Sequence, residues 1–125
     1  MRRFLLPTCL VLMPVAAAAA PSTGASVELS NFKFAPSDVV LRAGVPTVLR
    51  LTNNGGGGHS FAAPAFFAAA RVDPSSALLV HDGKVEVPGH ATVRISLTPA
   101  AGRYPLRCSH SLHSAFGMKG VITVR

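Results

Sequence analysis

The sequence predicts an all-β fold, an antiparallel sandwich of about seven short strands with one short helical insert. Seven short runs have the composition of strands, two of them (47–52 and 91–98) with clear apolar and polar alternation, and frequent Pro and Gly residues separate them. Alternation with a period of two is typical of strands that bury one face. One alanine-rich stretch has a helical composition instead. We therefore expect two packed sheets with a small helix beside them.

The runs expected to be strands are 27–34, 39–41, 47–52, 84–87, 91–98, 103–108 and 121–124. In the third run Leu49 and Leu51 share one face, which should be buried. Residues 64–72 contain paired phenylalanines among alanines, which favours one or two helical turns packed beside the sandwich. Asp73-Pro74 should end this helical segment.

Three segments divide the chain of 125 residues, which is long enough for one domain. Residues 1–20 have the pattern of a secretory signal peptide, and residues 21–26 should form a short disordered leader. Residues 27–125 should form the single folded domain of the chain. If the signal directs export, the protein is periplasmic or secreted.

The signal peptide is predicted from its charged start, its apolar middle and the small residues at Ala16–Ala20. We expect cleavage near Ala19-Ala20. A membrane anchor is the alternative, but the apolar stretch contains Pro7 and Pro14 and is shorter than the roughly 20 residues that span a bilayer. No membrane span is therefore expected after the signal is removed.

The chain is strongly basic, with 12 Lys and Arg residues against five acidic ones and a net charge of +7. Removal of Arg2 and Arg3 with the signal would leave a net charge of about +5. The basic residues form no run, and with one tyrosine and no tryptophan there is no aromatic stripe among them. Nucleic acid is therefore not an expected partner. A basic surface instead favours encounters with an acidic partner protein or an anionic membrane surface.

Cysteine usage points to a metal. Cys9 would leave with the signal, so Cys108 would be the single thiol of the exported chain. An unpaired thiol is a liability in an oxidising compartment unless it is used or shielded, and metal ligation does both. The alternative is a buried inert cysteine.

The end of the chain carries a metal-binding pattern. Cys108, His113 and Met118 follow one another with four residues between each, and strand-like runs lie on both sides. Thiolate, imidazole and thioether are soft ligands that select copper, and two histidines and a cysteine with a weak axial methionine form the blue-copper arrangement. The second imidazole must come from elsewhere. His59 is the candidate because Gly55–Gly58 before it permit unusual backbone angles and close approach, although these glycines could also form a floppy surface loop.

Three further histidines have weaker claims. His110 lies two residues after Cys108, and we interpret it as a solvated loop residue. If His110 instead bound the metal, the site would leave the blue class. His81 and His90 occur in turn-like sequence and should lie on the surface.

From Val27 to Val124 the chain resembles the cupredoxins, the small blue-copper proteins that include plastocyanin, azurin, pseudoazurin and rusticyanin. The spacing Tyr104-x3-Cys108-x4-His113-x4-Met118-x-Gly120 is similar to the closing motif of the family, and the loop lengths are most like those of rusticyanin. The resemblance implies a cupredoxin-like Greek-key β-sandwich that binds one copper ion. Its implied ligands are His59, Cys108, His113 and Met118.

The resemblance also implies roles for the neighbours of His59. Ser60 would tie the two ligand loops together and tune the thiolate, and the carbonyl of Gly58 would approach copper from the side opposite Met118. Leu112 departs from the glycine that many relatives with this loop length have. Core packing is the default for the phenylalanines and for Leu112, although some could frame an apolar patch at the His113 edge; these residues are Phe61, Phe66, Phe67, Leu112 and Phe116.

The function that these expectations favour is a periplasmic electron-transfer protein that cycles type 1 copper between Cu(II) and Cu(I), without enzymatic chemistry. Its partners would be redox proteins of the cytochrome or copper-oxidase type, and the protein itself would be a monomer. The alternative is a periplasmic copper carrier, chaperone or resistance protein that binds copper and hands it on. A third possibility is a catalytic red-type copper site with an open position, completed by His110 or water.

Overall fold

The structure is a computed structural model, and it describes residues 11–14, 23–111, 113 and 115–125. In chain order its elements are β1 (Thr23–Ser30), β2 (Lys33–Ala35), β3 (Asp38–Leu41), β4 (Thr47–Asn53), β5 (His59–Ala62), α1 (Pro64–Ala69), β6 (Arg71–Val72), the 3-10 turn η1 (Ala77–Leu79), β7 (Lys84–Val87), β8 (Thr92–Thr98), β9 (Gly102–Arg107) and β10 (Lys119–Val124). None of the helices among these residues has the length and hydrophobicity that a membrane crossing requires.

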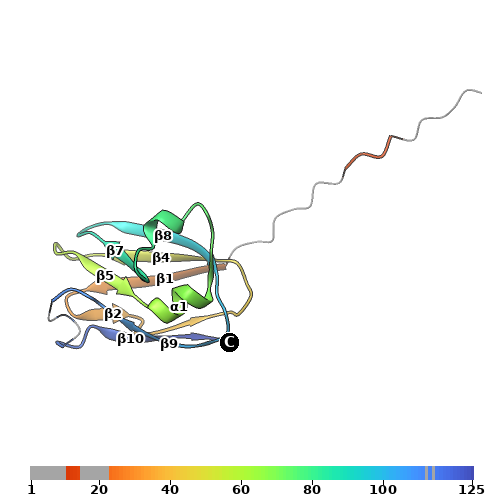
Figure 1. Cartoon of the computed structure of the whole chain (residues 1–125). Coiled ribbons are helices and arrows are strands. Elements are labelled where there is room, and N and C mark those ends of the chain that lie inside the picture. Colours follow the sequence, from red (N-terminus) through yellow and green to blue (C-terminus); the bar gives the residue numbers. More distant parts are fainter. Residues whose placement is uncertain (1–10, 15–22, 112, 114) are drawn as a thin grey trace, which may run out of the picture.

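Two five-stranded sheets form a sandwich, with α1 packed beside it (Figure 1). The strand order is β2-β1-β4-β8-β6 in one sheet and β3-β10-β9-β5-β7 in the other. The predicted β-sandwich with one short helix is therefore confirmed. The second sheet carries both β5, which begins with His59, and the β9–β10 pair that flanks Cys108 and Met118.

The sheets are mixed, not purely antiparallel as expected. β1 pairs with β4 in parallel, and β3 pairs with β10 in parallel. This arises because β3 lies in the opposite sheet from β1 and β4, so the chain returns to its first sheet by a crossover and not by a hairpin. The described residues contain ten strands where about seven were expected, since a turn splits the run 27–34 and several strands are only two to four residues long.

The first strand also begins earlier than predicted. Residues 23–26 were expected to belong to a disordered leader, but they pair with Thr47–Arg50 of β4. They are small or polar, so their composition carries no strand signal, and the register with β4 decides their conformation. The expected signal peptide lies mostly in residues 1–10 and 15–20, outside the described residues, and stays a prediction.

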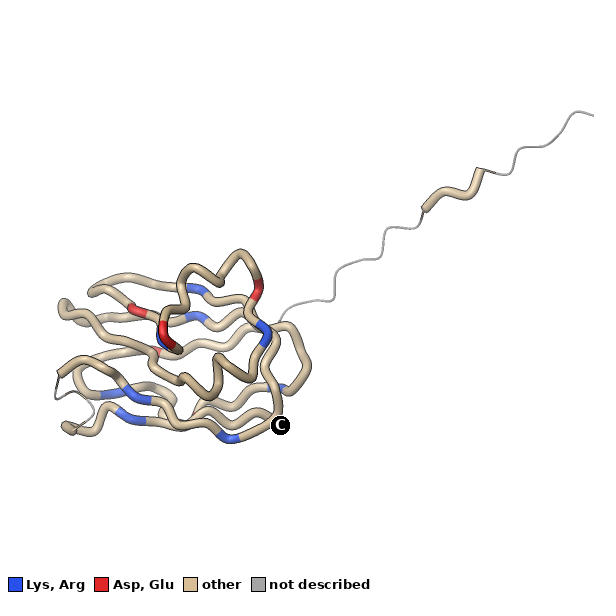
Figure 2. Tube along the Cα trace, viewed as in Figure 1, with Lys and Arg blue, Asp and Glu red and all other residues tan. Residues whose placement is uncertain are grey.

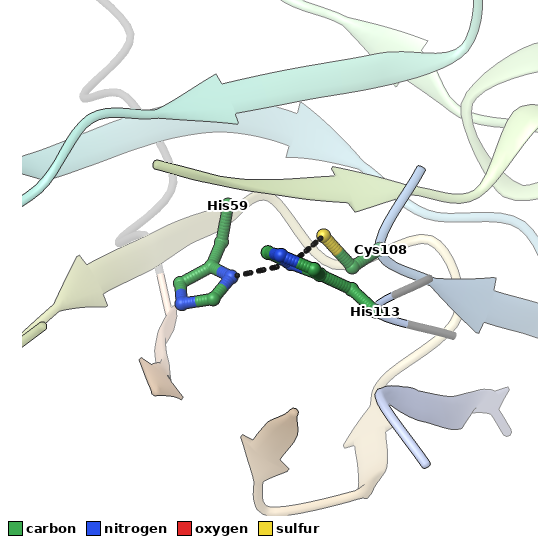
Figure 3. Close-up of side chains that lie close together, drawn as sticks. All are labelled: His59, Cys108 and His113. Atoms are coloured by element: carbon green, nitrogen blue, oxygen red, sulfur yellow. Dashed lines mark hydrogen bonds between the residues drawn. The ribbon is translucent and has the colours of Figure 1, made fainter. Parts of the chain in front are cut away.

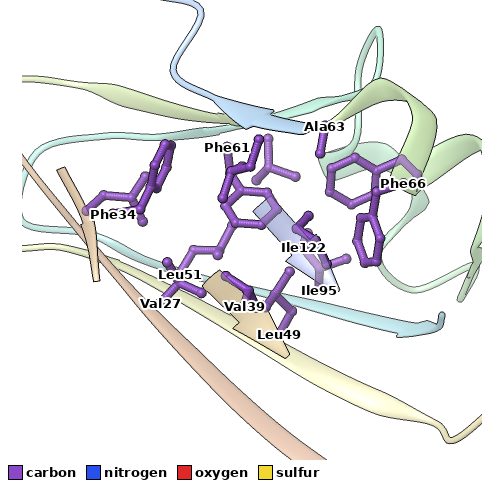
Figure 4. Packing of buried hydrophobic residues seen from close by; sticks show 14 of the residues in the cluster. Val27, Phe34, Val39, Leu49, Leu51, Phe61, Ala63, Phe66, Ile95 and Ile122 are labelled. Atoms are coloured by element: carbon purple, nitrogen blue, oxygen red, sulfur yellow. The ribbon is translucent and has the colours of Figure 1, made fainter. Parts of the chain in front are cut away.

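The core lies between the two sheets and follows the predicted alternation. Leu49 and Leu51 are fully buried on the inner face of β4, as expected. Phe34 and Phe61 meet edge to face with ring centroids 6.0 Å apart, and Phe66 closes the end of the cluster nearest the helix (Figure 4). Burial of each such side chain stabilises the fold by about 1.5–3 kcal/mol. This packing gives the metal-site strands a rigid support.

α1 fastens the strand that leads to Cys108. Pro64 stands in its first turn, where no backbone N–H is needed. The helix buries Phe66 and Phe67, and Phe66 packs edge-on against Tyr104 of β9 at 5.7 Å. The Tyr104 hydroxyl donates a hydrogen bond to the Ala100 carbonyl at 2.9 Å. β9 is thereby held by both its side-chain packing and its hydroxyl contact.

Candidate metal centre

The ligand loop, residues 108–118, connects two antiparallel strands. β9 ends opposite the start of β10, where Arg107 pairs with Lys119. The Cys108 N–H donates to the Met118 carbonyl at 3.1 Å, and the Met118 N–H donates to the His113 carbonyl at 3.0 Å. These bonds close the base of the loop. Cys108 and Met118 therefore lie at adjacent, fixed backbone positions.

Three side chains that can bind a metal, His59, Cys108 and His113, lie close together at one end of the sandwich, as the sequence predicts. The Nδ1 atoms of His59 and His113 lie 3.2 Å apart, and His113 Nδ1 lies 3.4 Å from Cys108 Sγ (Figure 3). All three donor atoms lie within 4.8 Å of one another. Two segments separated by about fifty residues along the chain are thus brought to one point.

The donor set fits a copper ion. Nitrogen and sulfur ligands stand about 2.0–2.3 Å from a bound transition metal, so donors that share one ion should lie about 3–4 Å apart. The separations of 3.2 Å between the two Nδ1 atoms and 3.4 Å between His113 Nδ1 and Cys108 Sγ agree with this. His59 and Cys108 are buried, with exposed fractions of 1% and 0%, and two imidazoles with a thiolate suit copper.

Electrostatics favour the metal-binding form of His59. Burial lowers the pKa of His59, and positive charge on His113 and then on His110 lowers the pKa further. The neutral imidazole is the form that binds a metal. His59 Nδ1 faces the other donors, at 3.2 Å from His113 Nδ1, while its buried Nε2 has no hydrogen-bond partner among the described residues.

Met118 ends the ligand loop, fully buried, directly before β10. The Met118 carbonyl accepts the hydrogen bond from the Cys108 N–H, so the two residues lie side by side. The axial role of Met118 stays a prediction, as does the approach of the Gly58 carbonyl to the metal.

Ser60 joins the two ligand segments. The Ser60 N–H donates to Cys108 Sγ at 3.4 Å, and its hydroxyl lies 3.8 Å from the same sulfur. The Ser109 N–H in turn donates to Ser60 Oγ at 2.7 Å. Donors that face a thiolate stabilise its charged form. These contacts agree with the loop-tying role that the resemblance implied.

Among the described residues, the cluster of metal-binding side chains does not include His110. His110 is also not the solvated loop residue that we expected. Its Nε2 lies 2.8 Å from Glu86 Oε2, and its ring stacks on His113 with centroids 5.5 Å apart. His110 lies two residues after Cys108, but its partner Glu86 belongs to β7, so the contact between them could not be predicted from the spacing of residues in the sequence. His81 and His90 are exposed, as predicted.

Sequence reasoning missed the residue that organises the glycine loop. Asn53 is buried, and its amide donates to the carbonyls of Gly57 and Val87 at 2.8 and 3.0 Å. A β-carbon on Gly89 would lie 2.2 Å from the Gly56 carbonyl oxygen, so the facing turn packs directly on the loop. The alternative of a floppy loop is therefore wrong. Asn before a glycine run is a turn signal that could have indicated this role.

The aromatic residues divide between core and surface. Phe61, Phe66 and Phe67 are core residues, whereas Phe116 is 64% exposed. Phe32, which the sequence did not single out, packs on Phe116 at 5.2 Å and meets His113 edge-on at 5.3 Å. Leu112 lies outside the described residues. Among the residues that the structure describes, Phe32 and Phe116 therefore form an apolar patch beside His113.

A β-sandwich that holds two imidazoles and a thiol close together at one end defines a copper-binding protein of the blue-copper type. Residues 3–124 match the cupredoxin-like domain family, and the chain belongs to that family. Copper is thus the metal of this site. No curated protein matches the chain.

Solved structures share the fold. Auracyanin B is 20% identical, with a TM-score of 0.60 over 87% of this chain and 93% of that one. A dithionite-reduced auracyanin from the photosynthetic bacterium Roseiflexus castenholzii is 18% identical, with a TM-score of 0.59 over 86% and 99%. Auracyanin A, a blue copper protein from Chloroflexus aurantiacus, is 17% identical, with a TM-score of 0.55 over 82% and 99%.

Proposed function

We propose that the protein is a one-electron carrier that holds a single type 1 copper ion. His59, Cys108 and His113 would bind the ion, with Met118 as a weak axial ligand. Copper, when bound, supplies the Cu(II)/Cu(I) couple. The observation that carries the proposal is the convergence of two Nδ1 atoms and one Sγ within 4.8 Å of one another.

The surroundings of the donors suit electron transfer better than substrate chemistry. His59 is part of β5, Cys108 directly follows β9, and Ser60 ties the two together. Such fixed donors change little between two oxidation states. Four protein ligands would also leave no open position, whereas catalytic metal sites keep one. A non-enzymatic role follows.

His113 offers the path to the surface. It is partly exposed, while His59 and Cys108 are buried. Phe32 and Phe116 border it with an exposed apolar patch. A redox partner that covers this patch would come close to the His113 ring without crossing the core. We assign electron entry and exit to this edge.

The partner is proposed to be an acidic redox protein of the cytochrome or copper-oxidase type. Basic positions are spread over both sheets, with few acidic ones among them (Figure 2). Arg107 and Lys119 face each other across β9 and β10 at the base of the ligand loop, and both are exposed. Like charges at a directly opposed pair repel one another, and an acidic partner would relieve this repulsion.

Export completes the proposal. The basic start, apolar middle and small-residue exit of residues 1–20 support a signal peptide and a periplasmic or secreted monomer. Mass spectrometry of the exported protein should show an amino terminus near Pro21. A protein that retains Met1 in the soluble periplasmic fraction would contradict the cleavage.

The test of copper function is spectroscopic. The exported protein loaded with Cu(II) should show an intense visible charge-transfer band that ascorbate bleaches and an oxidant restores. Cys108→Ala should abolish the band, whereas His81→Ala, a change at an exposed histidine, should leave it unchanged. Tight Cu(I) binding without any band would indicate a copper donor instead. A large copper hyperfine splitting in electron paramagnetic resonance would indicate a red-type site.

A further inference from the structure

One side-chain contact ties the ligand loop to a strand that carries no proposed ligand. His110 Nε2 lies 2.8 Å from Glu86 Oε2, and Glu86 belongs to β7, at the edge of the second sheet. This hydrogen bond requires only the Nε2–H, so it forms with either a neutral or a protonated ring. It therefore fixes the position of His110 whatever the charge of the imidazole.

The His110 ring has contacts on other sides as well. Its plane is inclined by 28° to that of His113, with centroids 5.5 Å apart. Its Cε1 lies 3.5 Å from the position that a β-carbon on Gly58 would occupy, so the ring rests on the glycine loop. The side chain is 34% exposed. A ring held at Nε2 and supported at Cε1 presents a fixed face to His113.

The strand register explains how Glu86 reaches the loop. Glu86 lies directly opposite Ser60 across β7 and β5, and side chains of such a pair lie on the same face of the sheet. Ser60 binds Ser109, and Glu86 binds His110. Two consecutive loop residues are thus held by one cross-strand pair, next to the strand residue His59.

We propose that His110 is a positioning residue for His113, and that Glu86 holds it in that role. The stacked ring would keep the His113 imidazole opposite His59 before the metal arrives and after it binds. Phe32 bounds the His113 ring elsewhere, edge-on at an interplanar angle of 90°. This inference rests on the proposed role of His113 as a copper ligand. Loss of such supporting contacts typically costs 10–100-fold in metal affinity.

Copper release tests the proposal. His110→Ala and Glu86→Ala should each increase the rate at which a chelator removes copper by about 10–100-fold. Matched controls are His81→Ala and Glu28→Ala, which remove the same side chains from exposed positions and should change the rate by less than about twofold. Glu86→Gln keeps an oxygen that accepts from Nε2–H and should restore a rate near that of the unchanged protein. Thermal unfolding of each copper-free variant checks that the fold is kept.

A double variant shows whether Glu86 acts through His110 or independently of it. If Glu86 acts through His110, the double variant should release copper no faster than His110→Ala alone, because coupled residues are not additive. In the copper-free protein, nuclear Overhauser contacts should connect the His110 and His113 rings, and Glu86→Ala should weaken these contacts while Glu28→Ala does not.

Either of two results would overturn the proposal: a blue protein in which His110→Ala releases copper at the unchanged rate, or a copper-free protein without contact between the two rings. The absence of a charge-transfer band in the unchanged protein would refute the proposed function instead. The ring contact in the copper-free protein would still report on the positioning role in that case.

Discussion

Of the four proposed ligands, only His113 reaches the surface. His59, Cys108 and Met118 have exposed fractions of 1%, 0% and 0%, whereas His113 is partly exposed beside Phe32. Burial keeps water away from the sulfur atoms of Cys108 and Met118 and protects the single described thiol from oxidation. The same arrangement leaves one imidazole edge open to a partner. Protection and access are thus assigned to different residues.

Met118→Gln tests the axial ligand. The amide oxygen is a harder donor than the thioether and favours Cu(II) over Cu(I), so the protein should keep copper and colour but show a lower reduction potential. Voltammetry of the copper-loaded protein measures this shift. Leu79→Gln, a change at an exposed residue, is the control and should leave the potential unchanged. An unaltered potential in Met118→Gln would show that the thioether does not contact the ion.

At the level of elements, the glycine loop owes its shape to one buried amide. Asn53→Ala would leave the carbonyls of Gly57 and Val87 without their donor, so we expect a loss of about 1–3 kcal/mol in the free energy of unfolding. Urea unfolding of the copper-free protein measures this loss. The neighbouring Asn54→Ala, at an exposed position, should cost less than about 0.5 kcal/mol. Equal effects of the two changes would argue against the organising role of Asn53.

A second prediction concerns the packing of the helix α1. Phe66 is fully buried against Phe67 and Tyr104, so Phe66→Ala should lower the free energy of unfolding by about 3–5 kcal/mol. Phe116→Ala removes the same ring from an exposed position and should change stability by less than about 0.5 kcal/mol. Guanidinium unfolding of both variants provides the comparison. An unchanged free energy of unfolding in Phe66→Ala would mean that the helix contributes little to the core.

Elements with a clear pattern were predictable, and those that depend on register were not. β7 occupies the residues predicted for it, because alternation and flanking turn residues define it locally. Residues 23–26 were missed because their pairing with β4 depends on long-range register. In the same way, the ligand loop was visible because Cys108, His113 and Met118 lie in one segment. Glu86 and Phe32 come from other strands or turns, so only the assembled sheets bring them to the site.

For the whole molecule, charge sets the rate of encounter. Within the described residues the salt bridges are Lys84–Glu86 and His110–Glu86, so most basic side chains face solvent without an acidic partner. Oxidation of the reduced protein by the anion hexacyanoferrate(III) should therefore slow as salt is added, and oxidation by a cationic cobalt(III) complex should speed up. Stopped-flow absorbance follows both reactions. Lys119→Glu should weaken both salt dependences, and a salt-independent rate would contradict electrostatic steering.

The closed base of the ligand loop has a consequence for how such a centre can be moved between proteins. Because Cys108 and Met118 are backbone-bonded at the junction of β9 and β10, three of the four proposed donors belong to one continuous peptide of eleven residues, 108–118. A recipient sandwich would have to provide only a histidine and a serine on the adjoining strand, together with a carboxylate one strand further out. Exchange of this single segment would then transplant the colour and potential of one protein into the frame of another.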